Sequence, residues 1–210
     1  MINYFGNYTW RGILLNRIIK ELNYASYLEL GVSDGERCYN IVNCANKIGV
    51  DSNPIINLPN VIHSYTDDFF KTLDQNKKFD LIYIDACHEK YQVYRDFCNS
   101  LKHLNSGGMI ILHDIYPLVE EDSSQDLNGD SYETWIDIVK KYPKETSTFI
   151  GYPGDREGTV GIFLKTDFDY SNCQVTDLNY SYEYFFNNLT KFIYHKTVTE
   201  DQLIMNAKCW

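Results

Sequence analysis

The chain has 210 residues, of which 44% are hydrophobic and 23% are charged. These values suit a single globular domain with its own core and exclude disordered and fibrous classes. Nineteen lysines and arginines against 29 aspartates and glutamates give a net charge of −10, so nucleic acid is an unfavourable partner. No apolar run approaches the roughly 20 residues that cross a bilayer, and residues 1–11 lack a signal-peptide pattern. We therefore expect a cytoplasmic protein with no membrane partner.

Short β-type runs alternate with helical patterns through the first half of the chain. The β-type runs are residues 27–30, 47–50, 61–64, 81–84 and 109–112. The helical patterns cover residues 12–22, 37–44, 67–74 and 91–104. This alternation is typical of β-α-β units. It predicts an α/β fold with a Rossmann-like, doubly wound parallel sheet and helices on both faces.

The pattern changes after residue 116. Residues 117–131 form an acidic insert that we expect to act as a lid, and a helical pattern resumes over residues 132–141. Two more β-type runs, at 146–151 and 159–164, flank a Pro-Gly turn signal at 153–154. They predict a terminal antiparallel hairpin and complete a seven-stranded, mostly parallel sheet.

We expect one domain, residues 1–210, that divides into three parts. An N-terminal helix lies within residues 1–25, the core spans residues 26–165, and an aromatic tail follows at 166–210. Apolar side chains at helical spacing in the tail predict packing against the core or in a homodimer: Tyr182, Phe185, Phe186, Leu189, Phe192 and Ile193. The six cysteines have no metal-site spacing, which favours free thiols.

A glycine-containing loop, residues 29–36, follows the first β-type run. Gly31 and Gly35 allow a sharp turn and a close approach of the backbone to a ligand. Ser33 and Glu36 have the spacing of a capping box, which predicts that a helix starts here.

The charge around this loop indicates the kind of cofactor. Glu29, Asp34 and Glu36 would repel the pyrophosphate of a dinucleotide, and the glycine spacing is not Gly-x-Gly-x-x-Gly. S-adenosylmethionine carries an ammonium, a sulfonium and no phosphate, so the same acids favour it. Further along, Asp51 is placed either for ribose hydroxyls or as a solvated turn residue. Asp67 is placed for an adenine amine or near a helix N-cap.

The ordered set of motifs resembles the class I S-adenosylmethionine-dependent methyltransferases. The set comprises the glycine loop, Asp51, Thr66-Asp67, residues 83–88 (YIDACH) and the segment from Gly107-Gly108 to His113-Asp114. The Ile-Asp-x-x-His-x-x-Tyr motif resembles the small-molecule O-methyltransferase branch, related to catechol and antibiotic-sugar O-methyltransferases. The resemblance covers roughly residues 23–165.

The resemblance implies cofactor contacts at six positions: Glu29 at the methionine ammonium, Gly31 and Gly35 along the cofactor, Asp51 at the ribose, Asp67 at the adenine, and Asp85. It also implies that Asp85 matches the acid that binds a divalent ion in metal-dependent members.

Four polar residues follow two strands that we expect to be neighbours. A divalent cation such as Mg²⁺ held by Asp85 and Asp114 would lower the pKa of an acceptor hydroxyl. His88 is suited to accept the proton near pH 7. His113 stands where metal-dependent relatives usually present an oxygen ligand, so it indicates a softer metal or a second base.

The acceptor is expected to contact residues near the insert. Candidates are Tyr91, Arg95, Tyr116 and Trp135, whose polar and aromatic character suits a sugar or glycan precursor. The favoured function is thus methyl transfer to a small-molecule hydroxyl. Two alternatives remain open, an NAD-dependent oxidoreductase on the same sheet and a non-catalytic interaction module.

Overall fold

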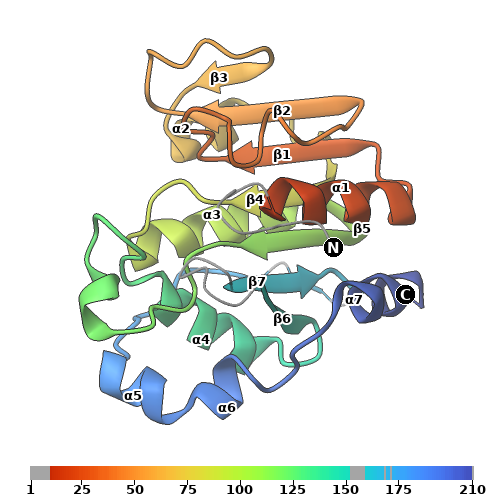
Figure 1. The fold of residues 1–210 in the computed structure, drawn as a ribbon. Coiled ribbons are helices and arrows are strands. Elements are labelled where there is room, and N and C mark those ends of the chain that lie inside the picture. The colour runs from red at the N-terminus through yellow and green to blue at the C-terminus, as the bar shows by residue number, and fades with distance from the viewer. Residues whose placement is uncertain (1–9, 152–158, 168, 171, 210) are drawn as a thin grey trace.

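The computed structural model describes residues 10–151, 159–167, 169–170 and 172–209. One seven-stranded sheet runs through it in the order β3-β2-β1-β4-β5-β7-β6 (Figure 1). The strands are β1 (Ser26–Leu30), β2 (Asn46–Asp51), β3 (Val61–His63), β4 (Phe79–Ile84), β5 (Leu104–Leu112), β6 (Thr146–Ile150) and β7 (Thr159–Leu164). Every β-type run of the sequence is therefore confirmed as a strand.

Strand directions also agree with the prediction. β1 to β5 pair in parallel, whereas β7 is antiparallel to both β5 and β6. Among the strands in the described residues, β7 alone thus runs against the others, which confirms the mostly parallel sheet with a terminal hairpin. The predicted Pro-Gly turn at 153–154 lies outside the described residues.

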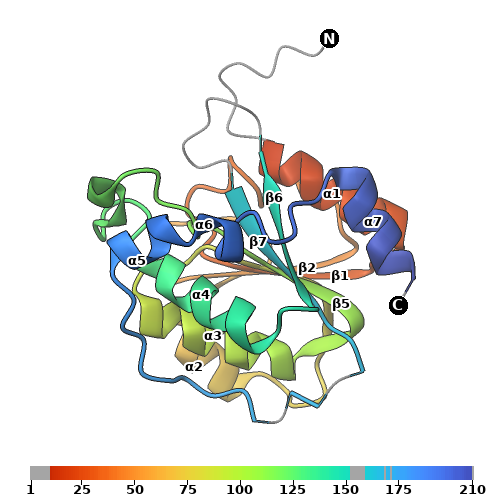
Figure 2. The same cartoon turned by 90° about the horizontal axis from the view of Figure 1, so that it is seen from below.

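Helices cover both faces of this sheet, as Figure 2 shows. They are α1 (Trp10–Leu22), α2 (Thr66–Thr72), α3 (Lys90–Lys102), η1 (Glu120–Ser123), α4 (Ser131–Lys141), α5 (Tyr182–Asn187), α6 (Leu189–Phe192) and α7 (Glu200–Lys208). Successive strand residues face opposite cores: Leu28 packs with α3 and α4, and Tyr27 packs with α1. None of these helices in the described part of the chain is long and apolar enough to cross a membrane.

The helix predicted at residues 37–44 is wrong, because the segment folds as a series of turns. Ser33 has a φ of +51°, which does not suit a helix N-cap, and the Asp34 carboxylate accepts the Glu36 N–H instead. The Lys47 ammonium donates to the carbonyls of Tyr39 and Val42. Local side-chain bonds therefore replace the helix, and the predicted capping box does not form.

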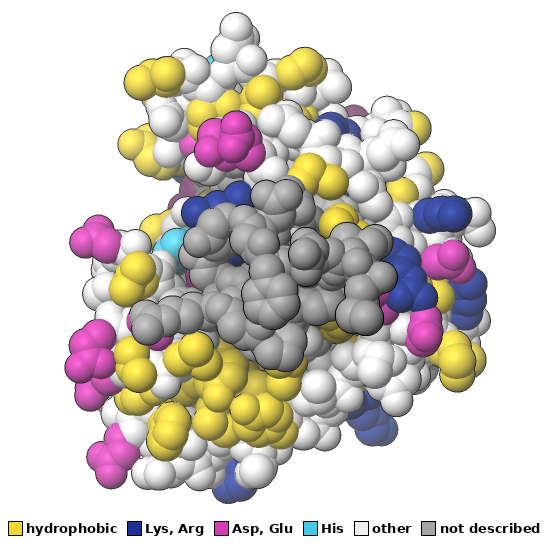
Figure 3. Space-filling view, in the orientation of Figure 1, with side chains coloured by type: hydrophobic (Ala, Val, Ile, Leu, Met, Phe, Trp, Pro, Cys, Tyr) yellow, Lys and Arg dark blue, Asp and Glu magenta, His cyan; other side chains and the backbone are white. Residues whose placement is uncertain are grey.

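The aromatic tail packs largely against the core that α3 and α4 form with the sheet. Phe185, Phe192 and Ile193 are buried in the same core as α3 and α4, so packing against the core is confirmed. Phe186 and Tyr194 stay exposed. Figure 3 shows hydrophobic side chains gathered on the surface beside the undescribed residues. Dimerisation through the tail stays a prediction.

Candidate active site

Two adjoining cavities lie at the carboxyl ends of the parallel strands. The larger, about 800 Å³, is lined by Asp51, residues 64–68 and Gln92. The smaller, about 510 Å³, is lined by residues that include Glu29, Asp85, His113 and Asp114. Gly31, Ala86 and His88 line both, so the two cavities meet at the ends of β1 and β4. An elongated ligand has room to extend from one cavity into the other.

Gly31 follows β1 and packs directly against Asp85, the residue that follows β4. Its φ is +86°, and a Cβ atom there would lie 2.0 Å from the carbonyl oxygen of Asp85. Only glycine satisfies both restrictions. The Asp51 carboxylate shapes the following turn by accepting the N–H groups of Val32 at 2.9 Å and Ser33 at 2.8 Å. Asp51 therefore borders the larger cavity and fixes the glycine loop.

Glu29 is buried below this loop, with 2% of its surface exposed. The Tyr27 hydroxyl donates to its carboxylate at 2.6 Å. Burial raises the pKa of Glu29 to about 8, an effect that the Tyr27 hydrogen bond only partly offsets. Glu29 is consequently mostly protonated at neutral pH, whereas Asp34 and Glu36 are exposed to solvent. The predicted ring of three negative charges is reduced to two in this state.

Residues of α2 and α3 enclose the far end of the larger cavity. The Gln92 amide donates to Thr66 Oγ1 at 3.0 Å and to Asp67 Oδ1 at 3.3 Å. Arg95 Nε lies 3.4 Å from the other oxygen of Asp67. Arg95 thus lies beside the predicted adenine contact, and its role as an acceptor contact stays a prediction. Sequence reasoning missed Gln92, which has no motif of its own.

Four predicted residues meet where β4 and β5 end. His113 Nδ1 lies 3.0 Å from Asp85 Oδ1 and 2.8 Å from Asp114 Oδ2. His88 Nε2 lies 3.1 Å from Asp114 Oδ2 and 3.8 Å from Asp85 Oδ1. The parallel register of Ile84 with Leu112 brings the residues after the two strands side by side. The structure therefore gathers Asp85, His88, His113 and Asp114 into one cluster.

A buried arginine supports Asp85 from behind. Arg11 Nη1 lies 3.8 Å from Asp85 Oδ2, and the Tyr83 hydroxyl lies 3.4 Å from the same oxygen. The Arg11 side chain is only 1% exposed. Sequence reasoning missed Arg11, although a signal exists: it stands four residues before Leu15 and seven before Ile18, on the apolar face of α1.

These contacts set the charges of the cluster. Burial works to lower the pKa of His113, but the carboxylates of Asp114 and Asp85 outweigh it and raise that pKa to about 10. Burial works to raise the pKa of Asp85, yet His113, His88 and Arg11 hold it well below its usual range. The pKa of His88 is raised, because Asp85 and Asp114 outweigh its desolvation. His113 therefore carries a positive charge at neutral pH, which disfavours its role as a second base.

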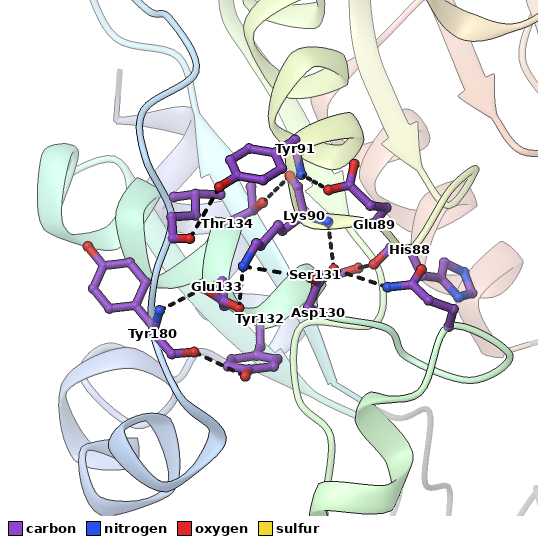
Figure 4. Close-up of polar contacts among 12 residues, drawn as sticks. His88, Glu89, Lys90, Tyr91, Asp130, Ser131, Tyr132, Glu133, Thr134 and Tyr180 are labelled. Carbon is purple, nitrogen blue, oxygen red and sulfur yellow. Dashed lines mark hydrogen bonds and ion pairs between the residues drawn. The ribbon is translucent and has the colours of Figure 1, made fainter.

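The remaining predicted acceptor contacts do not converge. Trp135 is fully buried and donates its indole N–H to the Phe192 carbonyl at 2.9 Å, so its prediction as an acceptor contact is wrong. The Tyr91 hydroxyl lies 3.3 Å from Asp177 in the tail, away from His88 (Figure 4). Its helical phase directs it there. Tyr116 is half-buried, with its hydroxyl 3.2 Å from that of Tyr194.

Comparison with known proteins supports a methyltransferase fold. Residues 28–115 match a family model described as a methyltransferase domain, and no curated protein matches the chain. An O-methyltransferase from Bacillus cereus has a TM-score of 0.56 at 16% identity over 74% of this chain and 81% of its own. Rv0187 from MTB has a TM-score of 0.57 at 16% identity over 76% and 80%. The N-methyltransferase NodS from Bradyrhizobium japonicum has a TM-score of 0.51 at 13% identity over 75% and 95%.

The fold and the matched residues both agree with the resemblance predicted from the sequence. The resemblance to class I methyltransferases is confirmed by the domain match over residues 28–115 and by the shared fold of the solved structures. Residues 28–115 are similar to a methyltransferase domain, and most residues of the candidate active site, from Glu29 to Asp114, lie within this matched segment.

We expect Glu29→Gln to change how stability depends on pH. The ordinary pKa of the carboxyl is 4.5 and its folded value is about 8, so the folded state retains a proton that the unfolded state loses. The resulting stability is fully present below pH 4.5 and is lost as the pH rises towards 8. Glutamine keeps a hydrogen-bond acceptor and does not ionise. In urea unfolding, the free energy of unfolding of the variant should rise relative to that of the wild type by on the order of 3 kcal/mol between pH 5 and pH 8.

The exposed Asp34→Asn is the control for this measurement, and it should follow the wild type at both pH values. A difference between Glu29→Gln and wild type that does not change with pH would show that Glu29 is ionised in the folded protein.

Proposed function

We propose that this protein transfers the methyl group of S-adenosylmethionine to a hydroxyl oxygen of a small molecule. The observation that carries the proposal is the meeting of the two cavities at His88, with the predicted cofactor residues on one side and the acid–histidine cluster on the other. One neighbour supports it: the Bacillus cereus enzyme is an O-methyltransferase in complex with SAH.

The cofactor is proposed to extend across both cavities. Asp51 would accept hydrogen bonds from the ribose hydroxyls, and the Thr66–Asp67 end with Gln92 would receive the adenine. Glu29 would face the methionine ammonium from the smaller cavity. A positive charge there favours the ionised carboxyl, so cofactor binding should draw the proton off Glu29.

His88 is proposed as the base. Methyl transfer from a sulfonium is an in-line displacement, so the acceptor oxygen must be aligned with the methyl carbon. The oxygen gains the methyl group, its proton passes to Nε2 of the neutral His88 ring, and the donor leaves as S-adenosylhomocysteine. Asp114 and Asp85, at 3.1 and 3.8 Å from Nε2, would stabilise the imidazolium that forms.

Divalent-metal assistance is the second part of the proposal. Atoms of Asp85, His113 and Asp114 lie within 4.8 Å of one another, so they could hold an ion together. Mg²⁺ prefers an all-oxygen octahedral shell, whereas two carboxylates and an imidazole suit an ion such as Mn²⁺, Fe²⁺ or Zn²⁺. These three side chains would hold it once His113 has released its proton, with Arg11 and Tyr83 orienting Asp85 from behind. When bound, it would lower the pKa of the acceptor hydroxyl.

The acceptor is proposed to be a sugar or glycan precursor. The smaller cavity is walled by polar and charged side chains, among them Arg37, Asp122 and Asp126. A polyol offers hydroxyl groups that can bond to each of these. This chemistry supports a hydrophilic acceptor over an apolar aromatic ring.

S-adenosylhomocysteine should bind the full chain, and Asp51→Asn should weaken it about tenfold, because the amide loses the charge that favours two ribose hydrogen bonds. Isothermal titration calorimetry gives the affinities. Asp74→Asn, an exposed substitution outside the cavities, serves as control. Binding of NAD without any binding of S-adenosylhomocysteine would overturn the proposed cofactor.

His88→Gln should lower turnover by about 100-fold or more, since a positioned base contributes that much. The assay follows methyl transfer from labelled cofactor to a panel of sugars and polyols. Cofactor affinity should stay within about threefold, and His63→Gln, an exposed histidine on β3, should behave as wild type. Wild-type turnover in His88→Gln would remove His88 as the base.

Mn²⁺ should bind the wild-type chain and lose affinity about tenfold or more in Asp114→Asn, because one of the three donors is neutralised. Electron paramagnetic resonance of free Mn²⁺ reports binding without any need for the acceptor. Asp74→Asn is again the control. Equal binding to wild type and Asp114→Asn would place the ion elsewhere.

A further inference from the structure

We propose that residues 127–131 form a clamp that positions His88 and Asp114 for catalysis, and that Asn128 is a positioning residue within it. The clamp is the last part of the acidic insert. The inference rests on the proposed function, because it assigns to the clamp the geometry of the base and of its neighbouring acid.

The clamp first holds the backbone of His88. The Asp130 N–H and the Ser131 hydroxyl both donate to the His88 carbonyl, each at 3.1 Å. The Asp130 carboxylate accepts the Lys90 N–H at 2.7 Å, as Figure 4 shows beside the His88 contacts. The backbone that follows His88 is therefore bonded to the clamp at two points, the His88 carbonyl and the Lys90 N–H.

The clamp also holds the two functional side chains. The His88 ring is hydrogen-bonded to the Leu127 backbone. The Asn128 amide donates to Asp114 Oδ1 at 2.9 Å, and this leaves Oδ2 to face His88 and His113. Asp114 has a φ of +55°, a backbone conformation that residues other than glycine adopt at a cost in free energy. The Asn128 bond is one of the contacts that hold it there.

Gly129 closes the clamp against His88. Its φ is +60°, and a Cβ atom would lie 2.2 Å from the His88 carbonyl oxygen and 2.5 Å from His88 Cβ. Any side chain at this position must push the His88 turn away. The chain holds a matched glycine at Gly107, whose φ is +72° and whose Cβ would have no neighbour within 4 Å.

The clamp is bonded to the preceding part of the insert, and the helix that follows it is bonded to the rest of the fold. Asn128 N–H donates to the Asp122 carbonyl and Gly129 N–H to the Ser124 carbonyl, each at 2.9 Å. Just beyond it, the buried Glu133 accepts the Lys90 ammonium at 2.9 Å and the Tyr180 N–H at 2.6 Å (Figure 4). The insert was expected to act as a lid, but these bonds make its end part of the wall of the site.

The test uses nuclear magnetic resonance of the histidine rings in the full-length chain. His88→Gln assigns the His88 signals by their loss. We expect Asn128→Leu, which keeps the volume and removes the amide, and Gly129→Ala to move the His88 ring signals. Gly107→Ala carries comparable backbone strain and should leave them in place. The exposed His63 provides an internal reference in every spectrum.

Once an acceptor is identified, Asn128→Leu should also lower kcat about tenfold or more, with cofactor affinity within about threefold. Unmoved His88 signals in folded Asn128→Leu would overturn the clamp, and so would an equal shift in Gly107→Ala. If Gly129→Ala fails to fold, Asn128→Leu decides the matter alone. The ring signals do not depend on cofactor binding, so loss of S-adenosylhomocysteine binding would count against the proposed function and leave the clamp standing.

Discussion

Asp85 is the residue whose backbone and side chain link the fold to the candidate site. Its N–H donates to the Leu30 carbonyl at 2.8 Å, and its own carbonyl lies against Gly31, so it ties β4 to β1. Its side chain bonds to His113 at the end of β5 and faces Arg11 from α1. A partly buried carboxylate is costly without such partners. The backbone and carboxylate contacts of Asp85 thus join three strands and a helix.

Charge balance in the site comes from the protein itself. His113 and Arg11 supply positive charges next to Asp85 and Asp114, while burial keeps Glu29 mostly protonated at neutral pH. Such a balance allows a cluster of acids to remain close together before any ligand binds. It also shows why counting acids along a loop overstates the charge a ligand meets, since burial decides which of them ionise.

Individual elements show how much of the fold the local sequence patterns predicted. The strands were predictable because apolar β-type runs bounded by turn residues can be buried on both faces of a parallel sheet, as Tyr27 and Leu28 are. The helix expected at 37–44 is replaced by turns, and the Lys47 ammonium, from the next strand, binds the carbonyls of Tyr39 and Val42. Trp135 and Arg95 were assigned to the acceptor by proximity to the insert; the phase of α4 directs Trp135 to the core, and that of α3 places Arg95 beside Asp67.

The sequence by itself determined the sheet, the glycine turn at Gly31 and the meeting of Asp85, His88, His113 and Asp114, because strand ends in a parallel sheet fall on one edge. Only the tertiary structure decided which groups surround them. Arg11 lies about 70 residues from Asp85, and Asn128 reaches Asp114 from an insert whose path no local periodicity describes. Contacts of this kind form when separate elements pack, so they follow from the assembled fold and not from any short segment.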